Sequence, residues 1–186
     1  GFYGQEGSHS REHERFFEVL ESHGFDTDKF INLYQKLAYD FLEARMPPHI
    51  NLAVTSALEH FTAMFATSAL DDGPIEGAHP IMRELLKWHA AEEIEHKAVA
   101  FDVLQQVDPR YSIRILGLVL AMMTLSGFWI IGTLMLVAQE EKGYQRALRA
   151  FVRGVRQRTI MDGKMRDAFK DYWRRDFYPN DADNRH

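Results

Sequence analysis

The chain has 186 residues, of which 46% are hydrophobic and 26% are charged, a composition typical of a folded globular protein. It contains no cysteine, which excludes disulfides, zinc fingers, thiolate iron sites and cysteine nucleophiles, so any metal must be held by His and carboxylate groups. The net charge is −5, but residues 1–110 carry 9 Lys+Arg and 19 Asp+Glu, whereas residues 111–186 carry 13 and 8. We therefore expect the two parts of the chain to face different surroundings.

The first two predicted helices cover residues 4–23 and about 26–45. The first is closed by Gly24, in a position that suits a C-terminal cap, and the second ends before the Pro47-Pro48 pair. The chain starts without an initiator Met or a signal-peptide pattern, and we expect a further segment upstream. The first helix carries three metal-capable groups on one face: Glu6, His9 and His13.

Two more helices are predicted before residue 110. The third, from about Ile50 to Leu70, has Glu59 in its middle and ends at Asp71-Asp72-Gly73-Pro74. The fourth runs from about Pro80 to Val107, with Pro in its first turn and Asp108-Pro109 as its stop. It carries the densest group of metal-capable side chains, at positions i, i+3, i+4 and i+7: His89, Glu92, Glu93 and His96.

Residues 115–138 contain no charged side chain, and as a helix they are long enough to cross a bilayer. Lys and Arg are concentrated after this run, so a single span would place the acidic part outside the cell. Ser126-Gly127 also permits a kink or a short hairpin, and we favour a re-entrant or peripheral attachment with both parts on the cytoplasmic side. The alternative is a buried central helix of a larger bundle, or of a homodimer interface.

The last part of the chain combines basic and aromatic residues. A basic amphipathic helix suited to an anionic lipid surface has one face formed by Lys142, Arg146, Arg149, Arg153 and Arg156 and the opposite face by Tyr144, Leu148, Phe151 and Val155. No nucleic-acid motif accompanies it, so we expect no nucleic-acid partner. The aromatic residues of the tail are expected to pack back: Tyr172, Trp173, Phe177 and Tyr178. We predict two domains, 1–110 and 111–186, packed on one another in an all-α fold.

The spacing Glu-x-x-His lets one turn of helix present a carboxylate and an imidazole to one cation. This motif occurs in residues 6–9 and 93–96, and Glu59 lies on a helix between them. A dinuclear carboxylate bundle uses two such motifs and one Glu from each of two other helices, so three of its four ligand-bearing helices are present. About 0.7 accidental matches are expected from the composition, and we interpret Glu76-x-x-His79 as one. The polar stripe of residues 89–96 either binds metal or is a solvated, salt-bridged face. Glu92 could replace Glu93 as a ligand, and His13 and His89 are further ligands or hydrogen-bond partners of ligands.

The segments 5–13, 57–60 and 88–102 resemble those of a bacterial family labelled predicted metal-dependent hydrolases. The resemblance covers most of the chain and implies a ferritin-like bundle. In that family another Glu-bearing helix precedes the Gln5-Glu6 segment, so the first bundle helix, with the fourth carboxylate ligand, is expected upstream. The helix of residues 26–45 would then be the long crossover of the bundle.

The expected cofactor is two metal ions, Fe with Mn or Zn as alternatives, held by Glu6, His9, His13, Glu59, His89, Glu93 and His96. The leading prediction is O2-dependent oxidation of an apolar or lipid-like substrate, served by an electron donor. The family label implies instead a metal-bound hydroxide that attacks an ester or similar bond, with Glu92 as general base. A third possibility is a non-enzymatic metal-binding or membrane scaffold.

Overall fold

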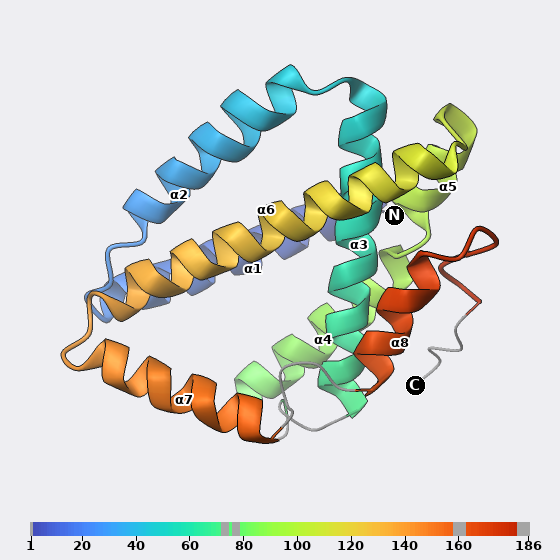
Figure 1. Cartoon of the computed structure of the whole chain (residues 1–186). Helices are drawn as coiled ribbons and strands as arrows, with labels where there is room; N and C mark the ends of the chain where they lie inside the picture. The colour runs from blue at the N-terminus through green and yellow to red at the C-terminus, as the bar shows by residue number, and fades with distance from the viewer. Residues whose placement is uncertain (1, 72–74, 76–78, 158–162, 182–186) are drawn as a thin grey trace. The chain divides into compact units, whose positions relative to one another are not determined.

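In the computed structural model the chain folds into helices joined by turns (Figure 1). The structure describes residues 2–71, 75, 79–157 and 163–181, and among these it contains no strand, which confirms the predicted all-α class. The helices form two compact units, one of residues Gly1–Met46 and Met123–Ile160 and the other of Pro47–Met122 and Met161–His186. We describe each unit by itself, and the predicted domains 1–110 and 111–186 stay a prediction.

The first unit contains α1 (Phe2–Ser22), α2 (Asp28–Tyr34), the π-helix η1 (Gln35–Glu43), the second half of α6 (Tyr111–Val137) and α7 (Gly143–Gln157). Gly24 has φ 90°, and the N–H of Phe25 donates to the Leu20 carbonyl over 3.1 Å, so the predicted C-terminal cap of α1 is confirmed. The predicted second helix also forms, but its second half has π geometry and continues directly from α2.

Two contacts attach α2 and the turn before it to α6. The Tyr34 ring lies edge-on to Phe128 at 4.7 Å between centroids. The Gln139 side chain accepts from the N–H of Asp26 over 2.6 Å and donates to the carbonyl of the same residue over 3.1 Å. One amide therefore satisfies both backbone groups of Asp26, which lies two residues before α2.

The second unit is built around α3 (Pro48–Asp71), which packs against α4 (Pro80–His96), α5 (Val99–Val107) and α8 (Gly163–Tyr172). The first half of α6 completes it. The most deeply buried side chains of this unit include Ala53, Ala57, Leu104, Leu118 and Tyr172. The predicted packing of the aromatic tail is confirmed for Tyr172, which is fully buried with its ring centroid 4.9 Å from that of His60 in α3, whereas Trp173 and Tyr178 are exposed.

The prediction of one continuous helix from Pro80 to Val107 is wrong. Pro80 does begin a helix and Asp108, with φ −154°, does end one, but the chain turns at Lys97 and Ala98 between α4 and α5. Both residues of the turn are buried. Both short helices pack against α3.

A close helix crossing of the second unit lies where Gly117 of α6 meets Ala53 of α3. A β-carbon added to Gly117 would lie 2.5 Å from the backbone carbonyl carbon and oxygen of Ala53. Leu118 and Ala121 of the same helix are fully buried beside this crossing. The absent side chain therefore allows the two backbones to touch.

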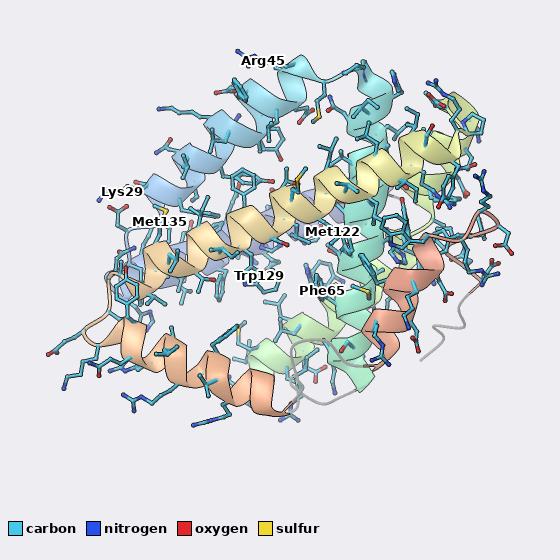
Figure 2. All side chains as sticks on the ribbon, viewed as in Figure 1. Lys29, Arg45, Phe65, Met122, Trp129 and Met135 are labelled. Atoms are coloured by element: carbon cyan, nitrogen blue, oxygen red, sulfur yellow. The ribbon has the colours of Figure 1, made fainter. Side chains whose placement is uncertain are left out.

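Among the described residues, α6 is the one helix that is long and apolar enough to cross a membrane, and 17% of its most apolar stretch is buried. Its exposed apolar residues share one face of the helix. Figure 2 shows the side chains along it, among them Met122, Trp129 and Met135. The low buried fraction leaves most of this stretch open to lipid or to another chain.

Candidate metal centre

The polar stripe of α4 is largely buried. Glu92, Glu93 and His96 are exposed to only 4%, 8% and 5%, and His89, one turn earlier, is half-buried. They lie on one side of the helix because they are spaced by three, four and seven residues from His89. Four ionisable groups so placed are costly in a helical core unless they meet partners or a cation. The stripe is therefore not a solvated face, although it contains the ion-pair contact of His89 with Glu93 that the salt-bridged alternative requires.

The donor atoms of His89 and Glu93 fit a shared cation. Nε2 of His89 lies 3.6 Å from Oε1 of Glu93. Two ligand atoms that each lie about 2.1 Å from a tetrahedral metal are roughly 3.4 Å apart. Imidazole and carboxylate together suit zinc, manganese or iron. The His89–Glu93 pair therefore has a separation and donor types that a divalent metal accepts.

Glu59 lies on α3, the helix against which α4 packs. It is half-buried and shares a side of α3 with the buried residues Ala63 and Ala66, four and seven positions later. Its backbone carbonyl accepts from the Thr62 hydroxyl over 3.0 Å, which is a contact within the helix. This position is compatible with the predicted ligand role, which stays a prediction.

Two imidazoles lie one turn apart on α1, in the first unit. Nε2 of His9 lies 2.8 Å from Nε2 of His13, and the two rings stack with centroids 4.7 Å apart. His9 and Glu6, one turn before it, are half-buried, and His13 is exposed. Two metal-bound nitrogens at right angles would lie about 3 Å apart, so this pair also fits two ligands of one cation.

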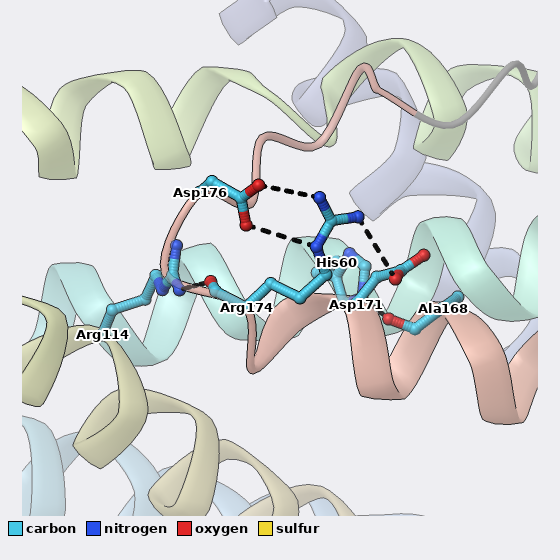
Figure 3. A network of polar contacts seen from close by, with 6 residues as sticks. All are labelled: His60, Arg114, Ala168, Asp171, Arg174 and Asp176. Atoms are coloured by element: carbon cyan, nitrogen blue, oxygen red, sulfur yellow. Dashed lines mark hydrogen bonds and ion pairs between the residues drawn. The ribbon is translucent and has the colours of Figure 1, made fainter.

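His60, interpreted from the sequence as structural, is a buried neutral side chain (Figure 3). Its Nε2 donates to the carbonyl of Ala168 in α8 over 3.1 Å, and its ring contacts Tyr172 and Phe177. Burial, with a smaller contribution from Lys97, lowers its pKa from 6.5 to about 4, although the Ala168 carbonyl and Asp171 act in the opposite direction. His60 therefore holds α8 against α3 and is no metal ligand.

This buried imidazole predicts a pH dependence of stability. The unfolded chain takes up a proton near pH 6.5 and the folded chain only near pH 4, so stability contributed by neutral His60 is lost as pH falls between these values. Between about pH 7.5 and pH 5 the loss is about 2 kcal/mol. We expect His60→Gln to show a smaller fall in unfolding free energy over this range, measured by urea denaturation. Equal falls in both proteins would contradict the prediction.

The sequence did not reveal the buried cation of α6, Arg114, which is exposed to 4%. Its guanidinium donates to the backbone carbonyl of Arg174 (Figure 3) and to that of Phe177. Its Cζ lies between 5.2 and 5.9 Å from the centroids of four aromatic rings. These are the rings of Phe101, Tyr111, Tyr172 and Phe177. The sequence offered one signal for this role. A single Arg stands directly before the uncharged run of residues 115–138, and the tail is rich in aromatic residues.

Outside the candidate ligands and His60, the described part of the chain contains three further His residues: His23, His49 and His79. The exposed His23 contacts the Val19 carbonyl of its own helix over 2.8 Å, and the half-buried His49 contributes to lowering the pKa of Asp108. His79 is exposed before α4, while Glu76, its partner in the third Glu-x-x-His match, lies outside the described residues. None of these observations assigns a ligand role to them.

The family model described as predicted metal-dependent hydrolase matches residues 1–183. No curated protein and no solved structure matches the chain. The match spans both candidate ligand groups, on α1 and on α4, as well as Glu59. The chain therefore belongs to the family of predicted metal-dependent hydrolases.

Proposed function

We propose that this protein is a metal-dependent hydrolase in which His89, Glu93 and His96 of α4 hold a divalent cation and Glu92 is the general base. The observation that carries the proposal is the 3.6 Å approach of His89 Nε2 to Glu93 Oε1 beside the buried Glu92 and His96. Membership of the family supports the reaction class.

A bound divalent metal supplies a water of lowered pKa and polarises the oxygen of the bond to be broken. The residues of α4 would bind this metal and transfer protons during the reaction. Glu93 and His96 are one turn apart on a rigid helix, so their donor atoms need little rearrangement to bind. Glu92 would accept the proton of the attacking water and return it to the leaving group. Burial of these residues limits access of bulk water.

The proposal also includes the other predicted ligands, Glu59 on α3 and Glu6, His9 and His13 on α1. Glu59, Glu6 and His9 are supported by their half-buried positions, and the two imidazoles by the 2.8 Å between their Nε2 atoms. A second metal ion would need such ligands, because three groups of α4 do not complete two coordination shells. A separate substitution of each residue tests its role as a metal ligand.

Oxidation of an apolar or lipid-like substrate is the second candidate function. The observation that favours it is the carboxylate-rich donor set, with Glu92 and Glu93 buried and Glu59 half-buried, since hard oxygen donors bridge two iron or manganese ions in ferritin-like bundles. That function requires an electron donor as a partner. The family description supports the hydrolase instead.

Elemental analysis of the purified chain, combined with hydrolysis assays, tests both functions. We expect a stoichiometric divalent metal, and hydrolysis of p-nitrophenyl acetate or bis-p-nitrophenyl phosphate that is lost with a chelator and regained with zinc or manganese. Two irons per chain with O2 consumption and no hydrolysis would favour the oxidation. A folded chain that neither contains nor takes up metal would overturn both and support the scaffold alternative.

We also propose that the protein is attached to the cytoplasmic side of a membrane, supported by the length and exposure of α6. A homodimer that covers the same helix is the competing proposal. Extraction of membranes with alkaline carbonate separates them, because complete release into the soluble fraction would exclude a spanning helix. Size-exclusion chromatography with light scattering would reveal a dimer.

A further inference from the structure

The α7 helix presents an exposed apolar face. Tyr144, Leu148, Phe151 and Val152 are exposed to 59%, 63%, 62% and 56%. Their spacing of four, seven and eight residues places them on one side of the helix. Large apolar side chains gathered in this way on an isolated helix face indicate a surface that another apolar phase covers.

The opposite face of α7 is basic. Arg146, Arg149 and Arg153 are exposed, and the helix contains no acidic residue. Arg146 donates to Glu140 over 2.9 Å, but both side chains remain open to solvent, so this surface ion pair contributes little. A helix with aromatic and aliphatic residues on one face and arginines on the other is suited to lie in the plane of a lipid interface.

The turn before α7 fixes where the helix begins. Lys142 has φ 61°, a left-handed conformation, and a β-carbon on Gly143 would lie 2.2 Å from the Val137 carbonyl oxygen. The C-terminal half of α6, which this turn joins to α7 within the same unit, exposes further apolar residues, among them Trp129 and Ile130. The same unit therefore exposes apolar side chains on two consecutive helices.

The combination of an apolar and a basic face indicates which kind of partner covers α7. A second copy of α7 packed through the same face would cover the apolar side chains but supply no anionic group to the arginines, and a nucleic acid would leave the apolar face exposed. An anionic lipid surface matches both faces of the helix. Its acyl chains bury the apolar side chains, and its headgroup phosphates accept hydrogen bonds from the guanidinium groups.

We propose that α7 lies in the plane of an anionic membrane surface, with Leu148 and Phe151 in the acyl boundary and Arg146, Arg149 and Arg153 at the headgroup phosphates. This deepens the proposed membrane attachment and rests on it. Each basic residue near such a surface strengthens binding about five-fold, so removal of three weakens it about 100-fold.

The test is flotation of the full chain with vesicles of phosphatidylcholine alone and of phosphatidylcholine mixed with phosphatidylglycerol. We expect tighter binding to the mixed vesicles, weakened about 100-fold in the variant Arg146→Gln/Arg149→Gln/Arg153→Gln. The variant Leu148→Ser/Phe151→Ser should weaken binding as well. Circular dichroism confirms that each variant is folded.

The matched control removes the same charge from exposed positions of the same unit: Arg11→Gln/Arg15→Gln/Lys36→Gln. An equal loss in the control would overturn the assignment to α7, as would full binding by the two α7 variants. Equal binding of every variant to neutral and anionic vesicles would leave membrane attachment standing and overturn the role of α7. No binding to either vesicle would overturn both proposals.

Discussion

Glu93→Gln is expected to remove metal from the α4 group and to lower the hydrolytic turnover of the metal-supplied protein by about 10³-fold or more. A metal that polarises the substrate contributes several kcal/mol to the transition state, and each 1.36 kcal/mol is about a factor of ten in rate. Gln keeps the size of a side chain that is 8% exposed but has no charge to hold a cation. Metal content and turnover are measured on the same sample.

The same helix offers the control. Glu95 is exposed and points away from the stripe, so Glu95→Gln is expected to keep both metal and turnover. Glu92→Gln is expected to keep the metal and lose turnover, together with the acidic limb of the pH profile that a general base produces. Wild-type metal content in folded Glu93→Gln would contradict the assignment of this stripe to a metal.

Arg114→Ala is expected to lower the free energy of unfolding by about 2–4 kcal/mol, since hydrogen bonds of a charged donor and cation–π contacts are lost together. The guanidinium contacts two carbonyls and four rings, most of them on or beside the C-terminal segment that begins with α8. We therefore also expect faster proteolytic cleavage after residue 172. Urea denaturation gives the first quantity and timed digestion the second.

Arg166→Ala is the control for that substitution. Arg166 lies on α8, and its exposed side chain approaches the equally exposed carboxylate of Asp167 only to 4.0 Å. A surface ion pair of this kind contributes little to stability, so we expect a much smaller change. Equal effects of the two substitutions would show that the buried arginine has no special part in holding the C-terminal segment.

Much of the helical pattern was predictable because its signals are local. Gly24, Pro80 and Asp108 mark helix ends through backbone preferences that act within one turn, and each lies where predicted. The turn at Lys97 and Ala98 was not predictable, because neither residue disfavours a helix and the turn serves packing of two segments on α3. The π geometry of η1 has no local signal that we can identify.

The candidate site was predictable in part for the same reason. The spacing of His89, Glu92, Glu93 and His96 depends only on helix geometry, so their shared side of α4 followed from the sequence. Their burial did not, since it depends on helices distant in the chain. The role of Arg114 also depends on residues about 60 positions later, as its contact with Arg174 shows.

The contact of Gly117 with Ala53 limits how the sequence of this chain can change. Any side chain at position 117 would force the axes of α3 and α6 apart, because the obstacle is a backbone carbonyl and no rotamer removes it. Separated axes would leave voids beside Leu118 and Ala121, which now have no exposed surface. A tolerated substitution would thus need larger residues at these neighbours at the same time, so these positions are expected to change together or not at all.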